Sequence, residues 1–350
     1  MNATTSNLHP LPARPSPQST WAPDVAGADP AFAAELEATM LRLATGDRFE
    51  RLGAIAHEHF LAGPRRQRGE LVRELAQVLS VPLDRSIPWA AACELIHAAS
   101  LIHDDLEDRS RWRQGSYSVW VRHGEAQAIN AGDLLLMLPF LALESLPTDP
   151  ATAWSLSRAI ARRAVETVRG QSLELCLIAS GRRTLEAYEE AVRGKSRVRW
   201  VLPVQGLAIL AGLSEAQAEA CAEPFAALGL ACQLADEVRD LYGQGRERRG
   251  DRLREGKVSA LLVEHLTRVP KDLEWLGPLL GKSASETTPE EIDRAALAFR
   301  GSGALAAVQA RLQQLLAALP ADQGLAAHPG LMAVAQARLT RVVVAVADLS

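Results

Sequence analysis

Four carboxylates lie within five positions, at Asp104, Asp105, Glu107 and Asp108, directly after an apolar segment of small residues that begins at Cys93. In a helix Asp104 and Asp108 project from one face, one turn apart, where their charges repel each other. The negative end of the helix dipole adds to this repulsion, so the cluster calls for a cation. Carboxylate oxygens that leave room for water and phosphate favour Mg²⁺. A solvated acidic helix end explains this one motif equally well.

A second acidic segment repeats the pattern further along the chain. Asp236, Glu237 and Asp240 follow another apolar stretch, and Asp236 and Asp240 are again one turn apart. Two such helices facing each other across a bundle would form a carboxylate cage for several metal ions. Such a cage suits chemistry on a diphosphate, because divalent ions neutralise that group and make it a leaving group. We therefore predict that Asp104, Asp108 and the second pair together hold Mg²⁺.

The elements that must position these acids are predicted to be helices. A helical period dominates from Ala31 onward and no segment alternates convincingly with period two, so the class is all-α. Residues 1–30 contain six prolines among Ser, Thr and Ala and are predicted to form a disordered arm. Residues 31–350 are predicted to form a single domain. A long helix is expected over residues 185–210, with a kink at Pro203.

Composition excludes several classes of protein. The net charge of -4, from 38 basic and 42 acidic residues, gives no basic field for nucleic acid or an anionic membrane. The four cysteines lack metal-ligand spacing, which argues against a disulfide framework or a zinc site and fits a reduced cytoplasm. The longest apolar run is about half of what a membrane span needs, and the N-terminus lacks an export signal. We therefore expect a cytoplasmic protein without a membrane span.

Basic residues near the acids add to the diphosphate hypothesis. The glycine-flanked segment 63–69 contains three arginines, among them Arg65 and Arg68, at a predicted helix start. Guanidinium groups and backbone N–H groups both suit phosphate oxygens, although a solvated basic loop explains the segment as well. Arg113 follows the first acidic cluster and could equally pair with its acids. Lys195 by itself is an ordinary surface charge, so its value depends on its place among the other motifs.

Taken together, these motifs resemble those of the trans-isoprenyl diphosphate synthases, or polyprenyl synthetases, from about residue 45 to at least residue 265. Residues 104–108 match the first DDxxD motif of that family without change. The other matches follow in the family's order: Gly63–Arg68 with GGKxxR, Arg113 with the first arginine of RRG, Gly132-Asp133 with AGD, Gly170-Gln171 with GQ, and Lys195-Ser196 with KT.

The resemblance implies an isoprenoid synthase-type helical bundle around a central cavity, usually assembled as a homodimer. It implies condensation of isopentenyl diphosphate with an allylic diphosphate, assisted by Mg²⁺, with three ions present when diphosphate is bound. The catalytic residues it implies are Asp104, Asp105, Asp108, Lys195, Asp236 and Asp240, of which the metal ligands are Asp104, Asp108, Asp236 and Asp240. The substrate-binding residues it implies are Arg65, Arg68, His97, Arg113, Gln171, Lys195 and Lys257.

Three departures from the family pattern bear on the chemistry. Gln114 stands where the family has the second arginine of RRG, which removes a charge-assisted contact worth up to about 3 kcal/mol. Glu237 replaces the second aspartate of the second DDxxD motif. The loop over residues 243–250 is shorter than in the family and lacks its Gly-Lys pair, for which one of the arginines of the loop could substitute.

Product length follows from the floor of the cavity. By the resemblance, Ala99 and Ser100 form this floor beneath the first acidic motif, and neither is bulky. The small side chains favour a product of twenty carbons or more, that is, geranylgeranyl diphosphate or a longer chain.

Two other functions compete with this hypothesis. A terpene cyclase or prenyl-coupling enzyme would reuse the fold without isopentenyl diphosphate, as Gln114 favours. The set Arg65, Arg68 and His97 argues against it, as does an aromatic content of only 5%, which leaves few π-faces to steer a cation. A regulatory subunit without activity is the third reading, and two nearly complete metal motifs argue against it.

Overall fold

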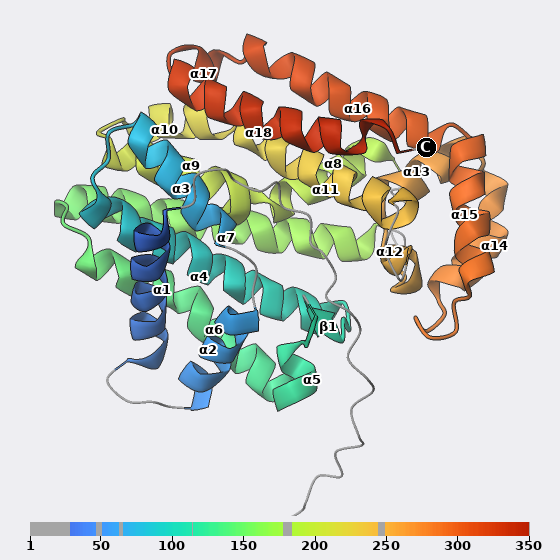
Figure 1. Cartoon of the computed structure of the whole chain (residues 1–350), viewed down its shortest axis with the longest axis horizontal. Coiled ribbons are helices and arrows are strands. Elements are labelled where there is room, and N and C mark those ends of the chain that lie inside the picture. The colour runs from blue at the N-terminus through green and yellow to red at the C-terminus, as the bar shows by residue number, and fades with distance from the viewer. Residues whose placement is uncertain are drawn as a thin grey trace, which may run out of the picture.

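The computed structural model describes residues 29–46, 51–62, 66–113, 115–177, 184–243 and 249–349. Helices account for nearly all the regular structure of these segments (Figure 1). The all-α prediction is confirmed. The predicted N-terminal arm lies outside the described residues except for its last two positions.

The first half of the chain supplies the lower layers of the bundle in Figure 1. Its helices are α1 (Pro30–Thr45), α2 (Arg51–Ala62), α3 (Gln67–Val78), α4 (Leu83–Glu107), α5 (Val119–His123), α6 (Glu125–Ala142), η1 (Leu143–Ser145) and α7 (Pro150–Cys176). Between α4 and α5 lies a small antiparallel ribbon of β1 (Trp112–Arg113) and β2 (Ser116–Tyr117).

The second half completes the bundle and covers it with a C-terminal layer. Its first helices are α8 (Leu185–Lys195), α9 (Arg197–Leu210), α10 (Glu215–Ala222), α11 (Phe225–Tyr242), α12 (Asp251–Arg254) and α13 (Ala260–Arg268). The remaining elements are η2 (Pro270–Asp272), α14 (Leu273–Leu280), α15 (Pro289–Gly301), α16 (Ala304–Ala318), η3 (Leu319–Ala321), α17 (Gln323–Ala326) and α18 (Pro329–Ala347).

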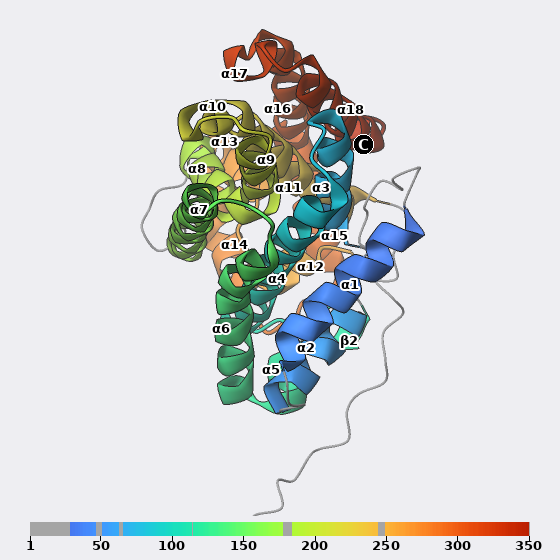
Figure 2. The ribbon, with the colours of Figure 1, turned by 90° about the vertical axis from the view of Figure 1, so that its left-hand side faces the viewer.

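Helix α4, which carries the first acidic cluster, is the central element. It packs against α1, α3, α6 and α9, and Figure 2 shows it between α6 and α3. Trp89 is fully buried on α4 and donates its indole N–H to the carbonyl oxygen of Pro203 over 3.1 Å. A Cβ atom at Gly206 would lie 1.9 Å from this indole, so the glycine lets α9 approach α4 closely. This contact fixes the height of α9 along α4.

The prediction of one helix over residues 185–210 is wrong, and the kink at Pro203 stays a prediction. The expected helix over residues 185–210 is divided at Ser196 into α8 and α9, and Pro203 lies inside α9. The Ser196 hydroxyl donates to the carbonyl oxygen of Val192 over 2.6 Å at the end of α8. The break makes Lys195 the last residue of α8. The side chains of Lys195 and of the first turn of α9 therefore line the interior of the bundle.

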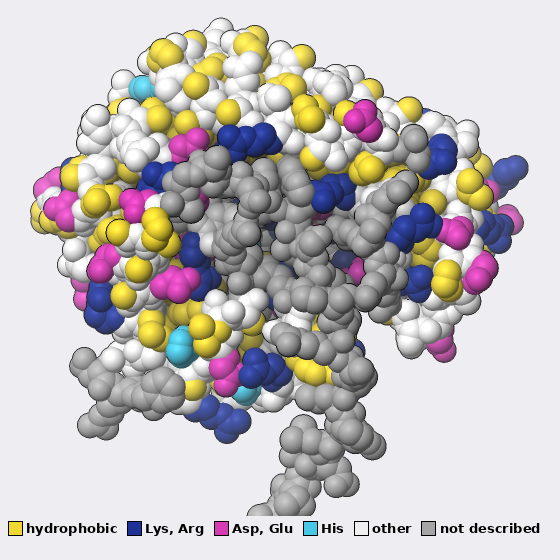
Figure 3. Space-filling view, in the orientation of Figure 1, with side chains coloured by type: hydrophobic (Ala, Val, Ile, Leu, Met, Phe, Trp, Pro, Cys, Tyr) yellow, Lys and Arg dark blue, Asp and Glu magenta, His cyan; other side chains and the backbone are white. Residues whose placement is uncertain are grey.

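The buried apolar side chains form one continuous cluster that extends from Phe32 in α1 to Val346 in α18. The C-terminal helices α16 and α18 complete this cluster above α11, as Figure 1 shows. On the face drawn in Figure 3, side chains of both charges are interspersed among the described residues. This surface agrees with the nearly balanced charge of the sequence.

Two helical segments, Glu125–Ser145 and Pro329–Ala347, are long and apolar enough to cross a membrane by length and composition alone. Less than half of each apolar segment is buried inside the protein. On α6 the exposed apolar side chains are Ile129, Met137 and Leu141. Burial within one copy of the protein therefore does not explain the apolar character of these two segments.

Candidate active site

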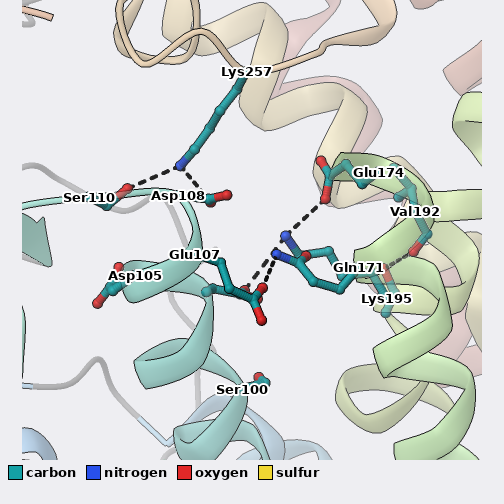
Figure 4. A network of polar contacts seen from close by, with 12 residues as sticks. Ser100, Asp105, Glu107, Asp108, Ser110, Gln171, Glu174, Val192, Lys195 and Lys257 are labelled. Carbon is teal, nitrogen blue, oxygen red and sulfur yellow. Dashed lines mark hydrogen bonds and ion pairs between the residues drawn. The ribbon is translucent and has the colours of Figure 1, made fainter. Parts of the chain in front are cut away.

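A cavity of about 430 Å³ lies between the ends of α4, α7, α8 and α9, with Gln233 of α11 and the segment 252–258 closing it. Acidic and basic side chains face each other across it (Figure 4). The acids are Asp104, Glu107, Asp108, Glu174 and Glu255, and the bases are His97, Arg113, Lys195, Arg199, Arg252 and Lys257. The cavity can therefore hold both cations and anions.

The two acids that are one turn apart on α4 each face a lysine. Lys195 Nζ lies 3.6 Å from Asp104 Oδ2 and 2.9 Å from Glu174 Oε2. Lys257 Nζ lies 3.0 Å from Asp108 Oδ2 and donates to Ser110 Oγ over 3.2 Å, as Figure 4 shows. The ammonium groups of Lys195 and Lys257 thus compensate part of the negative charge of Asp104 and Asp108.

Burial makes the charge on Asp104 costly. It raises the pKa of this carboxyl to about 6, although the charges of Lys195 and Arg113 act in the opposite direction, and the neighbouring charge of Asp108 raises it further. A carboxylate in this environment gains from any additional cation that enters the cavity. The site is therefore suited to a divalent metal ion.

Asp105, the residue after the first lysine-facing acid, is directed elsewhere. It is buried, and both of its oxygens accept hydrogen bonds over 3.1 Å from Nε of Arg113 on β1. A second bond from Nη2 of the same guanidinium completes a bidentate pair. The role of Asp105 in this arrangement is to hold the β1–β2 ribbon and Arg113 beside the cavity.

The second acidic turn, on α11, is arranged differently. Glu237 is buried and accepts hydrogen bonds from the Tyr188 hydroxyl, from Gln233 Nε2 over 3.0 Å and from the Ala260 backbone N–H over 2.7 Å. Arg252 Nη2 lies 3.4 Å from it. Burial raises the pKa of Glu237 despite these donors. This acid connects α11 to α8 and to the start of α13.

Asp240 is also buried, and its oxygens are engaged with the backbone. The N–H groups of Asp251 and Arg252, in the first turn of α12, each donate to one of its oxygens over 3.2 Å. Asp236 is partly buried and lies three residues after Gln233, which lines the cavity. Within the described ranges, no group of three or more metal-binding side chains is close enough to hold an ion unaided.

Close contact between α7 and α8 sets Lys195 beside Glu174. A Cβ atom at Gly170 would lie 2.2 Å from the backbone nitrogen of Lys195, so only glycine allows the two helices to meet there. One residue later, Gln171 Nε2 donates to Glu107 Oε2 over 2.7 Å. The glycine in the Gly-Gln pair is therefore explained by the need to bring α7 against the lysine.

A group of cationic side chains lies at the other end of the cavity, around His97 on α4. Arg68, in the first turn of α3, is almost fully buried, and its Nη1 lies 3.7 Å from Glu94 Oε2. The backbone N–H groups of Arg68 and Gly69 donate to Glu94 Oε1 over 2.8 and 2.9 Å. Burial lowers the pKa of Arg68 to about 10 and that of His97 well below its usual value. His97 is therefore neutral near pH 7.

A second cavity of about 340 Å³ adjoins the charged one and is mainly apolar. Ala99 and Ser100 of α4 line it, and Leu136 of α6 and Val198 of α9 form other parts of its wall. Asp104 lines both cavities. An apolar chain in this second cavity would therefore end beside the acidic turn.

The sequence profile of the polyprenyl synthetase family matches residues 50–296 of this chain. The chain belongs to the polyprenyl synthetase family. It is 30% identical over 247 residues to the geranylgeranyl diphosphate synthase of Methanosarcina mazei, covering 70% of this chain and 74% of that protein. It is 32% identical over 231 residues to a short chain isoprenyl diphosphate synthase of Methanocaldococcus jannaschii, covering 63% and 70%.

Among solved structures, this polyprenyl synthetase resembles a polyprenyl synthase from Caulobacter crescentus complexed with calcium and isoprenyl diphosphate. The two share a TM-score of 0.72 and 26% identity, covering 91% of this chain and 95% of the other. The predicted isoprenoid synthase-type bundle is confirmed by this similarity. The named relatives are synthases of prenyl diphosphates, so the chain is a prenyltransferase, and the relatives give no support to the cyclase alternative.

Several predicted site residues of this polyprenyl synthetase line one or both cavities. They are Asp104, Asp108, His97, Arg113, Gln171, Lys195 and Lys257. Arg68 adjoins the charged cavity through its electrostatic contact with His97. Arg65, Gln114 and the arginines at 246 and 248 lie outside the described residues.

Four cavity residues were missed by sequence reasoning: Glu174, Arg199, Gln233 and Arg252. Glu174 could have been found, because it follows Gln171 by three residues and so lies on the same face of its helix. Arg252 lies on the short helix α12, whose position beside the cavity no local pattern predicts. Its Nη2 lies 3.5 Å from Glu174 Oε1, on the side of the cavity where Lys195 lies.

Proposed function

We propose that this prenyltransferase condenses isopentenyl diphosphate with an allylic diphosphate to give a linear trans-prenyl diphosphate. The proposal rests on one observation: the two ends of the charged cavity suit two different forms of diphosphate. At one end Asp104 and Asp108 face Lys195 and Lys257, which suits a metal-bound diphosphate. At the other end lies the cationic group around His97, which suits a diphosphate without metal. The adjoining apolar cavity suits the hydrocarbon chain.

The acids of the first turn fit a divalent ion. Asp104 and Asp108 offer only oxygen donors, which is the ligand type of Mg²⁺, and this ion commonly takes further ligands from substrate phosphates and water. We propose that Asp236 contributes from α11 and that three ions bind together with diphosphate, which must supply oxygens because three carboxylates cannot complete the coordination of three ions. Each oxygen of Asp240 accepts one backbone N–H and keeps a further lone pair, so its hydrogen bonds are compatible with a part as a metal ligand.

Asp104 and Asp108 would hold the metal ion, which would supply positive charge to the allylic diphosphate and so make it a better leaving group. Lys195 and Lys257 hold the oxygens on which negative charge grows as the bond between C1 and oxygen breaks. The double bond of isopentenyl diphosphate then attacks the allylic C1, and the proton lost from the new cation passes to the released diphosphate. His97, being neutral, can orient the second diphosphate as a hydrogen-bond donor.

Incubation of the purified protein with labelled isopentenyl diphosphate and Mg²⁺ tests this function. Geranyl, farnesyl and geranylgeranyl diphosphate serve as separate primers, and mass analysis identifies the products. Incorporation of label into a longer prenyl diphosphate is the expected result. Formation of a hydrocarbon or alcohol from the allylic substrate alone would instead establish a cyclase.

For the product we propose geranylgeranyl diphosphate or a longer chain. Ala99 and Ser100 both line the apolar cavity, and neither side chain is large enough to end it. The variant Ala99→Phe is expected to shorten the product, because its ring would occupy the path of the growing chain. Unchanged product length in this variant would contradict the proposed floor.

We also propose that the protein is a cytoplasmic homodimer. Exposed apolar side chains on α6 continue onto α7, where Val165, Val168 and Leu175 are 48%, 64% and 53% exposed. A second copy would bury this surface in a twofold interface and would account for the apolar character of α6 without a membrane. Light scattering on the purified protein tests the assembly, and Val165→Asp, at a position that lines neither cavity, is expected to shift it to the monomer.

A further inference from the structure

The side chain of Arg199 has no electrostatic partner in the free protein. Arg199 stands in the first turn of α9 and lines the charged cavity together with His97. Its Nε atom is shielded from solvent and has no hydrogen-bond partner, and no carboxylate pairs with its guanidinium among the described residues. Its contact with the Trp200 ring, 5.4 Å from the centroid, leaves the N–H donors unused.

Four other arginines near this part of the protein differ from Arg199, because each is paired with a carboxylate. Each has a carboxylate at ion-pair distance: Arg66 with Glu37, Arg68 with Glu94, Arg113 with Asp105, and Arg338 with Glu74. An arginine without such a partner brings a full positive charge to the cavity wall. That charge is uncompensated until an anion enters.

Three helices bring this charge close to other cations. Helices α3, α4 and α9 pack against one another and carry Arg68, His97 and Arg199 respectively. The charge of Arg199 contributes to lowering the pKa values of both Arg68 and His97, so the three groups are near enough to repel when charged. Partly buried cations that repel each other cost free energy, and an anion among them recovers it.

The position of Arg199 distinguishes between the two diphosphates of the reaction. His97 and Asp104 are seven residues apart on α4, which separates them by about 10 Å along the helix axis. Asp104 has Lys195 beside it at the metal end. Arg199 acts electrostatically on the His97 end, where no acidic turn could hold a metal. The anion that fits there is a diphosphate bound by guanidinium groups alone.

We propose that Arg199 binds the diphosphate of isopentenyl diphosphate together with Arg68 and His97. In this way it supplies a cation in a chain that has Gln114 in place of the second family arginine. The inference rests on the proposed condensation, since it assigns Arg199 to one substrate of that reaction. Arg199 is in this sense a specificity residue, because it favours a second substrate that carries its own diphosphate.

Kinetics with both substrates varied provide the first test. For Arg199→Gln we expect the KM for isopentenyl diphosphate to rise about 10- to 100-fold, the usual effect of losing a charge-assisted contact, while the KM for the allylic diphosphate changes less than about threefold. Arg199→Lys should recover part of the loss. Arg193→Gln is the matched control, because Arg193 pairs with Glu189 on α8 and does not line the charged cavity.

Stability measurements separate binding from a structural role. Arg199 has no ion pair to lose, and its cation–π contact with Trp200 is weak at this exposure, so Arg199→Gln should melt at about the wild-type temperature. Isothermal calorimetry with isopentenyl diphosphate in buffer containing EDTA should show about 10-fold or greater weakening in Arg199→Gln relative to the wild type. EDTA removes binding that depends on metal, so this measurement reports on the guanidinium end.

Several results would overturn the inference. These are an unchanged KM for isopentenyl diphosphate in Arg199→Gln, a change confined to the allylic substrate, or a lower melting temperature of the free variant. If the wild-type protein binds isopentenyl diphosphate but does not extend any primer, the proposed condensation fails instead. In that case the calorimetric comparison of wild type and Arg199→Gln still decides whether Arg199 binds this diphosphate.

Discussion

The two acidic turns have the same spacing of carboxylates and use them in opposite ways. On the first turn, Asp104 and Asp108 face the cavity and lysine ammonium groups, whereas Asp105 is buried in the protein. On α11, Glu237 and Asp240 are buried and are bound by backbone and side-chain donors from other segments. The carboxylates of the first turn are available to a ligand. Most carboxylate oxygens of the second turn instead accept hydrogen bonds that hold α8, α12 and α13 in place.

This difference shows that spacing alone does not assign a role to an acid. The loop and helices that follow α11 return N–H donors to it, at Asp251, Arg252 and Ala260. The α4 turn receives side-chain cations instead of backbone donors on its cavity face. Substitutions in the two turns should therefore affect different properties.

The largest effect is expected at Asp104. Asp104→Asn should lower turnover by about a thousandfold or more, because one of the two carboxylates proposed to hold metal on the first acidic turn is lost. The free variant should be at least as stable as the wild type, since the buried charge of Asp104 is itself costly. Turnover is measured with labelled isopentenyl diphosphate and stability by circular dichroism. Retention of more than a few per cent of the activity would contradict the metal role.

Glu237→Gln should act mainly on stability. The amide would place an NH₂ group against donors from Tyr188, Gln233 or Ala260, so at least one buried donor would be unsatisfied. We expect the free energy of unfolding to fall by about 1 to 3 kcal/mol in urea titrations. Asp236→Asn, the adjacent position, is the matched control and should lower activity with a smaller loss of stability. Equal stability losses would mean that the division of roles within this turn is wrong.

A smaller effect is expected at Asp240. In Asp240→Asn one of the two oxygens that accept the Asp251 and Arg252 N–H groups becomes an NH₂ group, which cannot accept, so one of these hydrogen bonds is lost. The free energy of unfolding should fall by about 1 kcal/mol, and proteolysis near residue 250 should become faster in the free protein. Titration with Mg²⁺ in the presence of inorganic pyrophosphate should show a weaker effect than in Asp104→Asn. The reverse order would make Asp240 the more important ligand.

The smallest expected effect is that of pH on the stability of the free protein, and this effect does not distinguish the two acidic turns. Burial raises the pKa values of Asp104, Asp105 and Glu237 alike, so these groups make the free protein less stable as pH rises through their folded-state values. Burial lowers the pKa of His59 to about 3, which has the opposite sign. The unfolded chain takes up a proton near pH 6.5 and the folded chain does not, so stability falls as pH falls.

Between pH 7.5 and pH 6, His59 should therefore cost about 0.8 kcal/mol of unfolding free energy. His59→Asn should remove this part of the slope, and a second contribution of the same sign should remain from His97, whose pKa is also lowered. Urea titrations at the two pH values measure the difference. An identical slope in wild type and variant would show that His59 is protonated in the folded protein.

Much of the fold and of the site could be predicted from local patterns. Periodicity indicated the helices, and the charges at Asp104, Asp108 and Lys195 indicated a diphosphate site. The orientation of each carboxylate could not be predicted, because partners far along the chain decide it: Tyr188 and Ala260 for Glu237, for example. No sequence pattern singles out Arg199, because its lack of an ion-pair partner can be seen only in the structure.

The lysines that face the acidic turn make metal entry an exchange reaction. Before an ion can reach Asp104 and Asp108, the ammonium groups of Lys195 and Lys257 must release them, and a diphosphate gives those ammonium groups another partner. Metal and diphosphate therefore bind with positive thermodynamic coupling, and each raises the affinity for the other by the same factor. Free Mg²⁺ alone should bind weakly, so the metal ions needed for catalysis bind only when a diphosphate substrate is present.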